Sequence, residues 1–294
     1  MRLRAFELDE PVPTLNKPHV IATLKPWVDV GRSGSLALNW MEDILGARDL
    51  AKLARPGEFM DFTRHRPTSF VAAGRRRMTI PNTYVTFART EFENDFIFCH
   101  LLEPHANGEE YVESVLDLMK HFGAERFTMI GSMHDYVPHT RPLTVTGEGV
   151  GEKVRQVVID NNVESIEYSG PTSICFLIPQ RSPDIDIESL TLIAHLPQYT
   201  QMDEDYTGAL RLMDILADIY KLPIDQKYVD QSKQQLAQID DALEKNPQLK
   251  TIIGQLESHY DNRDETPEEQ EPTELSPEVE QFLAEMDRKF REEE

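Results

Sequence analysis

The stretch richest in reactive side chains is HDYVPHTRPLTVTG, residues 134–147, which follows an apolar run, RFTMIGS, with the pattern of a strand. Asp135, His139 and Arg141 supply a carboxylate, an imidazole and a guanidinium. In a parallel α/β sheet such a loop lies at the carboxyl edge, where ligands bind. These groups can transfer protons or bind an anion. The alternative is a structural role, in which Arg141 pairs with a carboxylate and His139 donates to backbone carbonyls.

A glycine turn, GRSGSLALNW at residues 31–40, is a second candidate site. It follows the first expected strand and opens a helix, so free backbone N–H groups near Gly31, Arg32 and Ser33 can hold a phosphate. It matches neither GxGxxG nor GxxxxGK[ST], and no lysine stands where a nucleotide loop needs one. The alternative is that the glycines permit a tight turn and close packing of the helix on the sheet.

Signals for a metal site or an activated nucleophile are weak in this sequence. His134 and His139 stand five apart on a proline-bounded loop, which matches no standard zinc spacing. Ser132 does not lie on a GxSxG elbow. We therefore expect no metal, no cofactor and no catalytic residue.

The basic side chains concentrate in one place. Arg64, His65 and Arg66 precede the run SFVAA, and three consecutive arginines, residues 75–77, follow Gly74. This pattern predicts a basic hairpin, which can bind a phosphate or nucleic acid. In a chain as acidic as this one, the favoured interpretation is pairing with acidic surface on the same chain or on a neighbouring subunit.

The elements that must position these residues alternate between strand and helix patterns. Short β-branched and aromatic runs predict strands: residues 19–24, 69–73, 83–89, 95–103, 126–132, 173–179 and 190–196. Helical periodicity predicts helices after Gly34, over residues 108–122 and over residues 206–220. This alternation predicts an α/β domain over residues 1–222, with a largely parallel sheet covered on both faces.

Beyond that domain the pattern is helical only. Apolar stripes that include Leu236, Ile239 and Ile252 predict a helical hairpin over residues 223–260, either a lid on the sheet or a docking arm for a protein partner. Residues 261–275 have the composition of an acidic linker. Residues 276–294 predict an amphipathic helix whose stripe must pack on this chain, a neighbouring subunit or an outside partner.

Composition limits the classes of function. The 294 residues carry a net charge of −22, which argues against binding nucleic acid or an anionic membrane. The chain contains no apolar run long enough to span a bilayer, and its first residues do not form a secretory signal. Both cysteines, Cys99 and Cys175, lie in apolar runs, so buried thiols and a cytoplasmic location are expected.

Five stretches between residues 18 and 262 together carry a family resemblance: GRSGSLALNWM, MIGSMHDYVPHTRPLTVTG, YSGPTSI, LIAHLPQYTQMDEDYTGALRLMDIL and NPQLKTIIGQLESHYD. In order and spacing they resemble the PAC2 family, named for a proteasome assembly chaperone, and the last helix is similar to that of bacterial members. The resemblance implies a three-layer α/β/α sandwich, phosphorylase/hydrolase-like, with a C-terminal helical extension. It also implies proteasome-like subunits as partners and a homo-oligomer, with a trimer favoured.

Two hypotheses about function follow. The leading one is a non-enzymatic protein-binding or assembly factor, which contacts its partner chiefly through His139 and Arg141 and secondly through Leu236, Ile239 and Ile252 of the hairpin. The alternative is an enzyme or small-ligand binder acting on an anionic substrate. Its site gathers six residues at the carboxyl edge of the sheet: Gly31, Arg32, Ser33, Asp135, His139 and Arg141.

Overall fold

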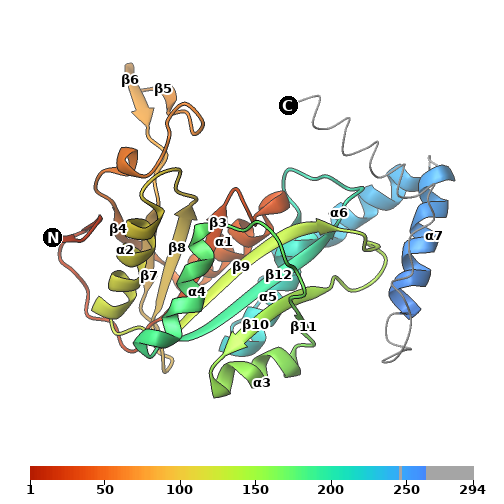
Figure 1. The fold of residues 1–294 in the computed structure, drawn as a ribbon. Helices are drawn as coiled ribbons and strands as arrows, with labels where there is room; N and C mark the ends of the chain where they lie inside the picture. The colour runs from red at the N-terminus through yellow and green to blue at the C-terminus, as the bar shows by residue number, and fades with distance from the viewer. Residues whose placement is uncertain (245–246, 263–294) are drawn as a thin grey trace.

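A ten-stranded mixed sheet forms the centre of the molecule in the computed structural model, which describes residues 1–244 and 247–262 (Figure 1). Its strand order is β1-β2-β4-β7-β8-β3-β9-β12-β10-β11. The strands are β1 Arg2–Leu3, β2 Phe6–Leu8, β3 His19–Lys25, β4 Arg48–Leu53, β7 Tyr84–Ala88, β8 Phe96–Leu102, β9 Arg126–Asp135, β10 Val145–Val150, β11 Glu164–Ser165 and β12 Glu188–Pro197. A separate two-stranded sheet pairs β5 Thr68–Ala72 with β6 Arg75–Thr79.

The centre of the sheet is parallel and its flanks are largely antiparallel. Strands β8, β3, β9 and β12 pair in parallel, and β3 is buried along all but its last residue. The pairs β7–β8, β4–β7 and β10–β12 are antiparallel. The prediction of a largely parallel sheet is therefore right for the centre and wrong for the flanks. Antiparallel neighbours require only short connections, as between β7 and β8, whereas parallel neighbours require a crossover.

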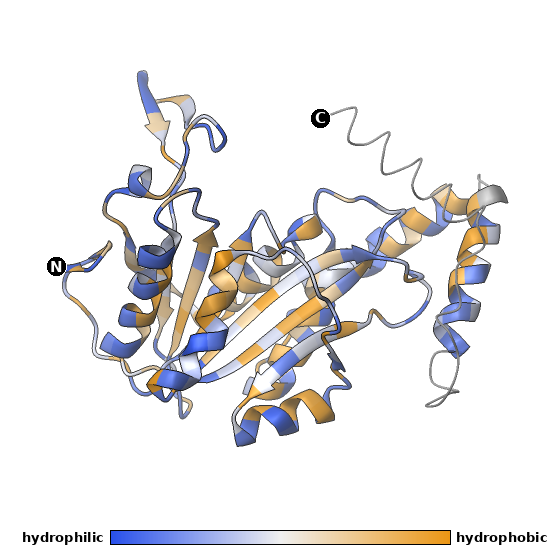
Figure 2. Cartoon of the chain, in the orientation of Figure 1, coloured by the Kyte–Doolittle hydropathy of each residue, from blue (hydrophilic) through white to orange (hydrophobic). Residues whose placement is uncertain are grey.

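Helices cover both faces of the sheet, which confirms the predicted three-layer α/β/α architecture (Figures 1 and 2). The helices of the body are α1 Ser33–Leu45, α2 Gly108–His121, α3 Glu152–Asp160, α4 Leu177–Arg181 and α5 Tyr206–Tyr220. One apolar core joins the sheet to α1, α3 and α5, and a second joins it to α2 and α4. Within the described residues, no helix is both long and apolar enough to cross a membrane.

One predicted strand is helical in the structure, and another lies outside the central sheet. The run SICFLIP, residues 173–179, is a 3₁₀ turn, Ile174–Phe176, followed by α4. The Ser173 hydroxyl accepts a hydrogen bond from the backbone N–H of Cys175, which caps that turn, and Pro179 has no N–H for a strand ladder. A short buried apolar run looks the same in a helix and in a strand. The predicted strand at 69–73 is confirmed as β5, in the basic hairpin that the sequence predicts, but this hairpin is separate from the central sheet.

A helical hairpin follows the α/β body. Helix α6 spans Gln226–Glu244 and α7 spans Pro247–Asn262, as the stripes at residues 223–260 predict. Apolar residues of both helices pack against each other and against Tyr199 and Met202 of the loop after β12. The predicted linker beyond residue 262 and the predicted helix at 276–294 lie outside the described residues.

Candidate functional site

The loop that follows β9 is joined to the helical hairpin by Arg141. Its guanidinium makes a bidentate pair with Asp261, through Nε at 2.8 Å and Nη2 at 2.7 Å, and its Nη1 lies 3.2 Å from Glu257 Oε1. The hydrogen bonds to Asp261 raise the pKa of Arg141 and hold the pKa of Asp261 below its usual value. This is the structural role considered for Arg141, and both carboxylates come from α7.

His139 is buried in the same contact between loop and hairpin. Its backbone N–H donates to Tyr199 Oη at 2.8 Å, while Nδ1 lies 2.7 Å from Tyr199 Oη and Nε2 lies 3.1 Å from Asp240 Oδ1 of α6. Burial raises the pKa of the Tyr199 phenol above its ordinary value, so Tyr199 is neutral and its hydroxyl can donate to Nδ1. His139 therefore fixes the loop to both the β12–α5 connection and the hairpin.

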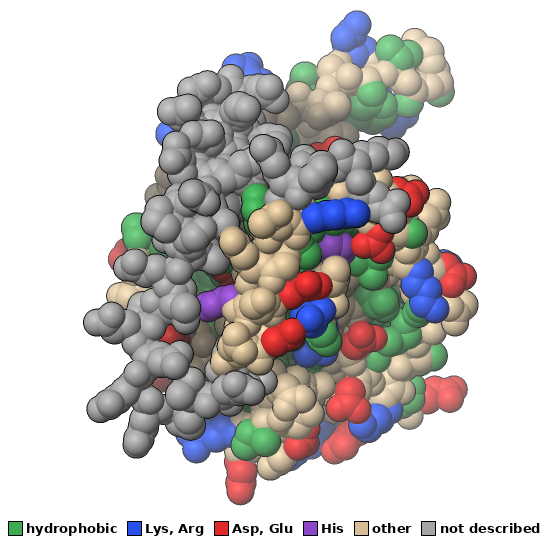
Figure 3. All heavy atoms as spheres, turned by 90° about the vertical axis from the view of Figure 1, so that its right-hand side faces the viewer, with side chains coloured by type: hydrophobic (Ala, Val, Ile, Leu, Met, Phe, Trp, Pro, Cys, Tyr) green, Lys and Arg blue, Asp and Glu red, His purple; other side chains and the backbone are tan. Residues whose placement is uncertain are grey.

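The hairpin residues predicted to bind a partner lie on its inner side. Ile239 and Ile252 are buried, Leu236 is partly buried, and all three pack in the small clusters around Tyr199. Their apolar side chains hold the hairpin against the body, so the surface open to another molecule is the outer, charged side. Figure 3 shows this end of the molecule, where acidic and basic side chains are interspersed.

The glycine turn is a closely packed connection rather than an open phosphate cradle. Gly31 has φ +56°, and a Cβ there would lie 2.8 Å from Asp205 Cβ. The Ser33 hydroxyl donates to the carbonyl of Asp205 at 3.1 Å, and Arg32 pairs with Glu204 at 2.6 Å. All three turn residues thus contact the segment that begins α5.

The N-terminus of α1 already holds an anionic group of this chain. The Asp29 carboxylate accepts hydrogen bonds from both the backbone N–H and the hydroxyl of Ser35. Burial raises the pKa of Asp29, and the two bonds from Ser35 oppose that rise. A phosphate at this helix end would have to displace Asp29, which favours the packing interpretation of the turn over the phosphate interpretation.

The six residues of the predicted small-ligand site do not form one contact network. Gly31, Arg32 and Ser33 contact the start of α5, whereas His139 and Arg141 contact the hairpin. In the part of the chain that the structure describes, no hydrogen bond joins the first group to the second. Both lie at the carboxyl edge of the sheet, but each is tied to a different segment.

Asp135 takes part in a three-residue relay that the sequence did not reveal. Its Oδ2 lies 2.7 Å from Nδ1 of His195 on β12, and Nε2 of His195 lies 2.8 Å from Oγ1 of Thr146 on β10. Burial by itself raises the pKa of Asp135, but hydrogen bonds from His195 and the Tyr136 N–H outweigh it and lower the pKa. An ionised carboxylate that orients an imidazole toward a hydroxyl can support general-base chemistry. The advance signal was that residues 126–132 and 190–196 were both predicted to be strands, with Asp135 three residues beyond the first and His195 near the end of the second.

Three apolar side chains at this edge face solvent. Trp27 is 47% exposed, Met133 38% and Tyr136 42%. The backbone N–H of Ser132 donates to the carbonyl of Val28 at 3.0 Å, which places the Trp27 turn beside the end of β9. Sequence inspection missed Trp27, because one tryptophan after a strand carries no sign of whether it is buried.

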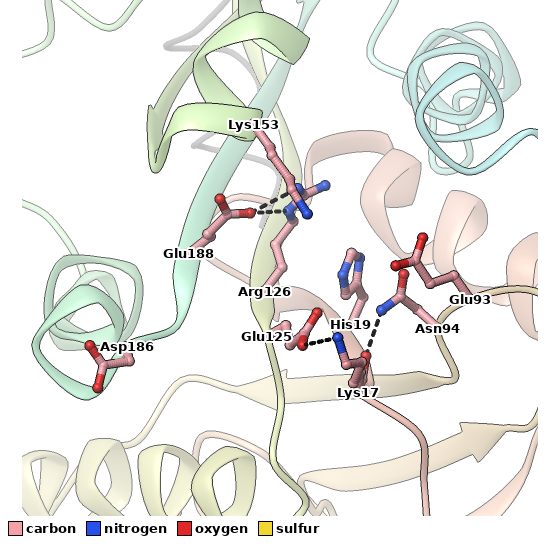
Figure 4. A pocket seen from close by; sticks show the side chains of 9 residues that line it. All are labelled: Lys17, His19, Glu93, Asn94, Glu125, Arg126, Lys153, Asp186 and Glu188. Atoms are coloured by element: carbon pink, nitrogen blue, oxygen red, sulfur yellow. Dashed lines mark hydrogen bonds and ion pairs between the residues drawn. The ribbon is translucent and has the colours of Figure 1, made fainter.

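The opposite, amino-terminal edge of the sheet contains a polar cavity of about 490 Å³ (Figure 4). Four of its charged side chains form two ion pairs. Arg126 donates to Glu188 at 2.8 Å, and Lys17 lies 3.0 Å from Glu125. His19 lies between these pairs in the view of Figure 4 and contacts Tyr220 Oη through Nδ1 at 3.2 Å. Among the described residues there is no cluster of histidine, cysteine and carboxylate side chains suited to a metal ion.

Comparison with known proteins identifies relatives of this chain. The model of the PAC2 family matches residues 23–245. No curated protein matches the chain significantly. The fold is similar to a protein of unknown function from Corynebacterium glutamicum, with a TM-score of 0.77, 21% identity, and coverage of 88% of this chain and 97% of that one.

Two further solved structures share the fold. A PAC2 family protein from Streptomyces avermitilis has a TM-score of 0.70 and 22% identity, covering 76% of this chain and 95% of that one. A proteasome-assembly chaperone homologue from Mycobacterium tuberculosis has a TM-score of 0.68 and 18% identity, covering 78% and 95%. At these identities the likeness establishes the fold alone.

Proposed function

This chain belongs to the PAC2 family, and on that premise we propose that it is a non-enzymatic protein-binding factor of the assembly-chaperone type. The similar fold of a proteasome-assembly chaperone homologue supports this class of function and makes proteasome-like subunits the first partners to test. The free, buried cysteines Cys99 and Cys175 support a location in the cytoplasm.

The observation that carries the proposal is the exposure of three apolar side chains at the carboxyl edge: Trp27, Met133 and Tyr136. Aromatic side chains of this kind are the usual anchors of protein interfaces. Asp135, next to Tyr136 in the chain, is already engaged by His195, and Arg141 of the same loop is engaged by Asp261. A partner protein can bury the aromatic groups without breaking those pairs.

The hairpin acts as a support for this surface in the proposed function. Leu236, Ile239 and Ile252 hold it on the body, while His139 and Arg141 fix the 134–142 loop to it. The loop and hairpin therefore present one continuous, preorganised surface, which lowers the entropic cost of binding. We include a homo-oligomer in this proposal, with the trimer as the favoured form.

Replacing Trp27 and Tyr136 together by alanine tests the proposal. We expect the variant to recover about tenfold less of its partner than the wild-type chain in a native pull-down quantified by mass spectrometry, because truncating two aromatic anchors removes most of the energy of a small interface. The control is Phe92→Ala with Tyr168→Ala, which truncates two exposed aromatic side chains elsewhere. Equal recovery by the two double variants would rule out the proposed surface.

A second candidate function, an enzyme acting on an anionic substrate, is favoured by the Asp135–His195–Thr146 relay. Its hydroxyl and imidazole lie 2.8 Å apart, within the range for proton transfer. Thr146 is partly exposed.

Thr146→Val and His195→Gln test that candidate, with 4-nitrophenyl phosphate as the anionic probe. If the relay is catalytic, each variant is expected to release 4-nitrophenol about 100-fold more slowly than the wild-type chain, because His195→Gln removes the general base and Thr146→Val removes the hydroxyl that this base deprotonates. Thr200→Val, which removes a hydroxyl bonded to the Pro197 carbonyl, serves as the control. Equal rates in all four proteins would exclude this candidate.

A further inference from the structure

A basic β-hairpin projects from the body of the molecule (Figure 1). We call residues 64–80 the arm; it contains strands β5 and β6, five arginines and no acidic residue. Every residue of the two strands except Ala72 is exposed. The arm therefore has a charge of +5 in a chain whose remaining residues carry −27.

Both faces of the arm combine apolar and cationic side chains. On one face Phe70 stands opposite Arg77, and on the other Val71 stands opposite Arg76. Val71 and Met78 are 68% and 63% exposed. The Arg76 guanidinium donates to the Ser69 hydroxyl at 3.2 Å, so it lies along the hairpin. The face with Val71 and Met78 therefore offers a partner two exposed apolar side chains beside the positive charge of Arg76.

Such a hairpin is unusual as a free surface. A two-stranded hairpin is marginally stable on its own in water, and its two outer edges have unpaired backbone groups. Contiguous exposed apolar side chains mark interaction sites in soluble proteins. A partner segment suited to the arm is therefore acidic and carries an apolar stripe of its own.

The C-terminal segment of this chain, residues 263–294, has both properties. It contains thirteen acidic residues against four basic ones. Its apolar residues follow helical spacing: Val279, Phe282, Leu283, Met286 and Phe290. The segment complements the arm in charge and supplies an apolar stripe for the exposed Val71 and Met78, which share one face of the arm.

The geometry favours docking between two copies. The C-terminal segment continues from α7, and α7 and the arm lie on opposite sides of the molecule in Figure 1. We propose that the C-terminal segment of one copy docks on the arm of a second copy. This inference rests on the homo-oligomer included in the proposed function. Such head-to-tail contacts close a ring when repeated around an axis, as in a trimer.

A mixing experiment with two full-length variants tests the inference. The arm variant carries Arg75→Glu, Arg76→Glu and Arg77→Glu, and the tail variant carries Phe282→Ser, Leu283→Ser and Phe290→Ser. Each variant alone is expected to be monomeric by light scattering, with the dissociation constant of self-association raised about tenfold or more. Their equimolar mixture is expected to form a 1:1 dimer, because the intact tail of the first can dock on the intact arm of the second.

A control variant with the same charge change elsewhere, Lys52→Glu, Lys233→Glu and Arg155→Glu, is expected to keep the wild-type mass. The inference is overturned if the wild-type chain is monomeric, if either test variant keeps the wild-type mass, or if the mixture stays monomeric. Circular dichroism of each variant checks that it is folded. These substitutions leave Trp27 and Tyr136 unchanged. The self-association experiment therefore tests this inference, and the pull-down with the Trp27 and Tyr136 variant tests the proposed function, independently of each other.

Discussion

Replacing Gly131 with alanine is expected to lower the free energy of unfolding by about 3 kcal/mol, the upper end of the usual cost of overpacking a core. A Cβ at this position of β9 would lie 2.3 Å from the carbonyl oxygen of Val28 and 3.2 Å from Cδ1 of Ile193. The Val28 carbonyl is also the acceptor for the backbone N–H of Ser132. The backbone at Val28 must therefore move, and it would carry the neighbouring Trp27 with it.

Urea unfolding of the variant and the wild-type chain measures this cost. Gly254→Ala provides the matched control, because Gly254 is an exposed position of helix α7 where a Cβ meets no atom within 4 Å. That substitution is expected to stabilise the protein by about 0.5–1 kcal/mol. If Gly131→Ala behaved like Gly254→Ala, the close approach of Val28 to β9, and with it the placement of Trp27, would be wrong.

His19 is expected to make the protein sensitive to acid. The side chain is only 8% exposed at the start of β3, and burial, aided by the charges of Arg126 and Lys153, lowers its pKa to about 3. The unfolded chain binds a proton at this residue below about pH 6.5, whereas the folded chain does not. Stability is therefore lost as the pH falls from about 6.5 to about 3, at about 1.4 kcal/mol per pH unit.

His19→Asn isolates this contribution, because asparagine can still accept a hydrogen bond from Tyr220. Between pH 7 and pH 4.5 the wild-type chain is expected to lose about 2.7 kcal/mol more unfolding free energy than the variant, as measured by urea unfolding at both values. The exposed His121→Asn serves as the control and is expected to follow the wild-type chain. Parallel losses in wild type and His19→Asn would contradict the burial of a neutral imidazole at this edge.

Local sequence patterns were sufficient to predict much of the fold. The β-branched run at 19–24 predicts β3, because a strand covered on both faces is apolar at every position. The apolar stripe of α2 follows the helical period. The end of α2 is predicted from Gly123, which has φ +65°, a left-handed conformation that glycine adopts easily. Such features can be predicted from residues that are neighbours in the chain. The prediction of a strand at 173–179 was wrong because it used only the local pattern. The segments that pack against a short apolar run, and not its period, decide whether it forms a helix or a strand.

The candidate site depended on contacts between distant residues. Arg141 was predicted to pair with a carboxylate, but its partner Asp261 is 120 residues away and becomes a neighbour only when the hairpin packs on Tyr199. The Asp135–His195–Thr146 relay requires β9, β12 and β10 to be adjacent, with β10 antiparallel.

The sequence by itself therefore determined the periodic elements, the family resemblance and the separation of charge between a basic arm and an acidic end. The tertiary structure alone decided which polar groups are engaged, that Asp29 fills the α1 terminus, and that Trp27 stays exposed. The physical reason is that period and turn propensity are properties of a short segment. Burial and pairing are set by which segments pack together, and no short segment encodes that choice.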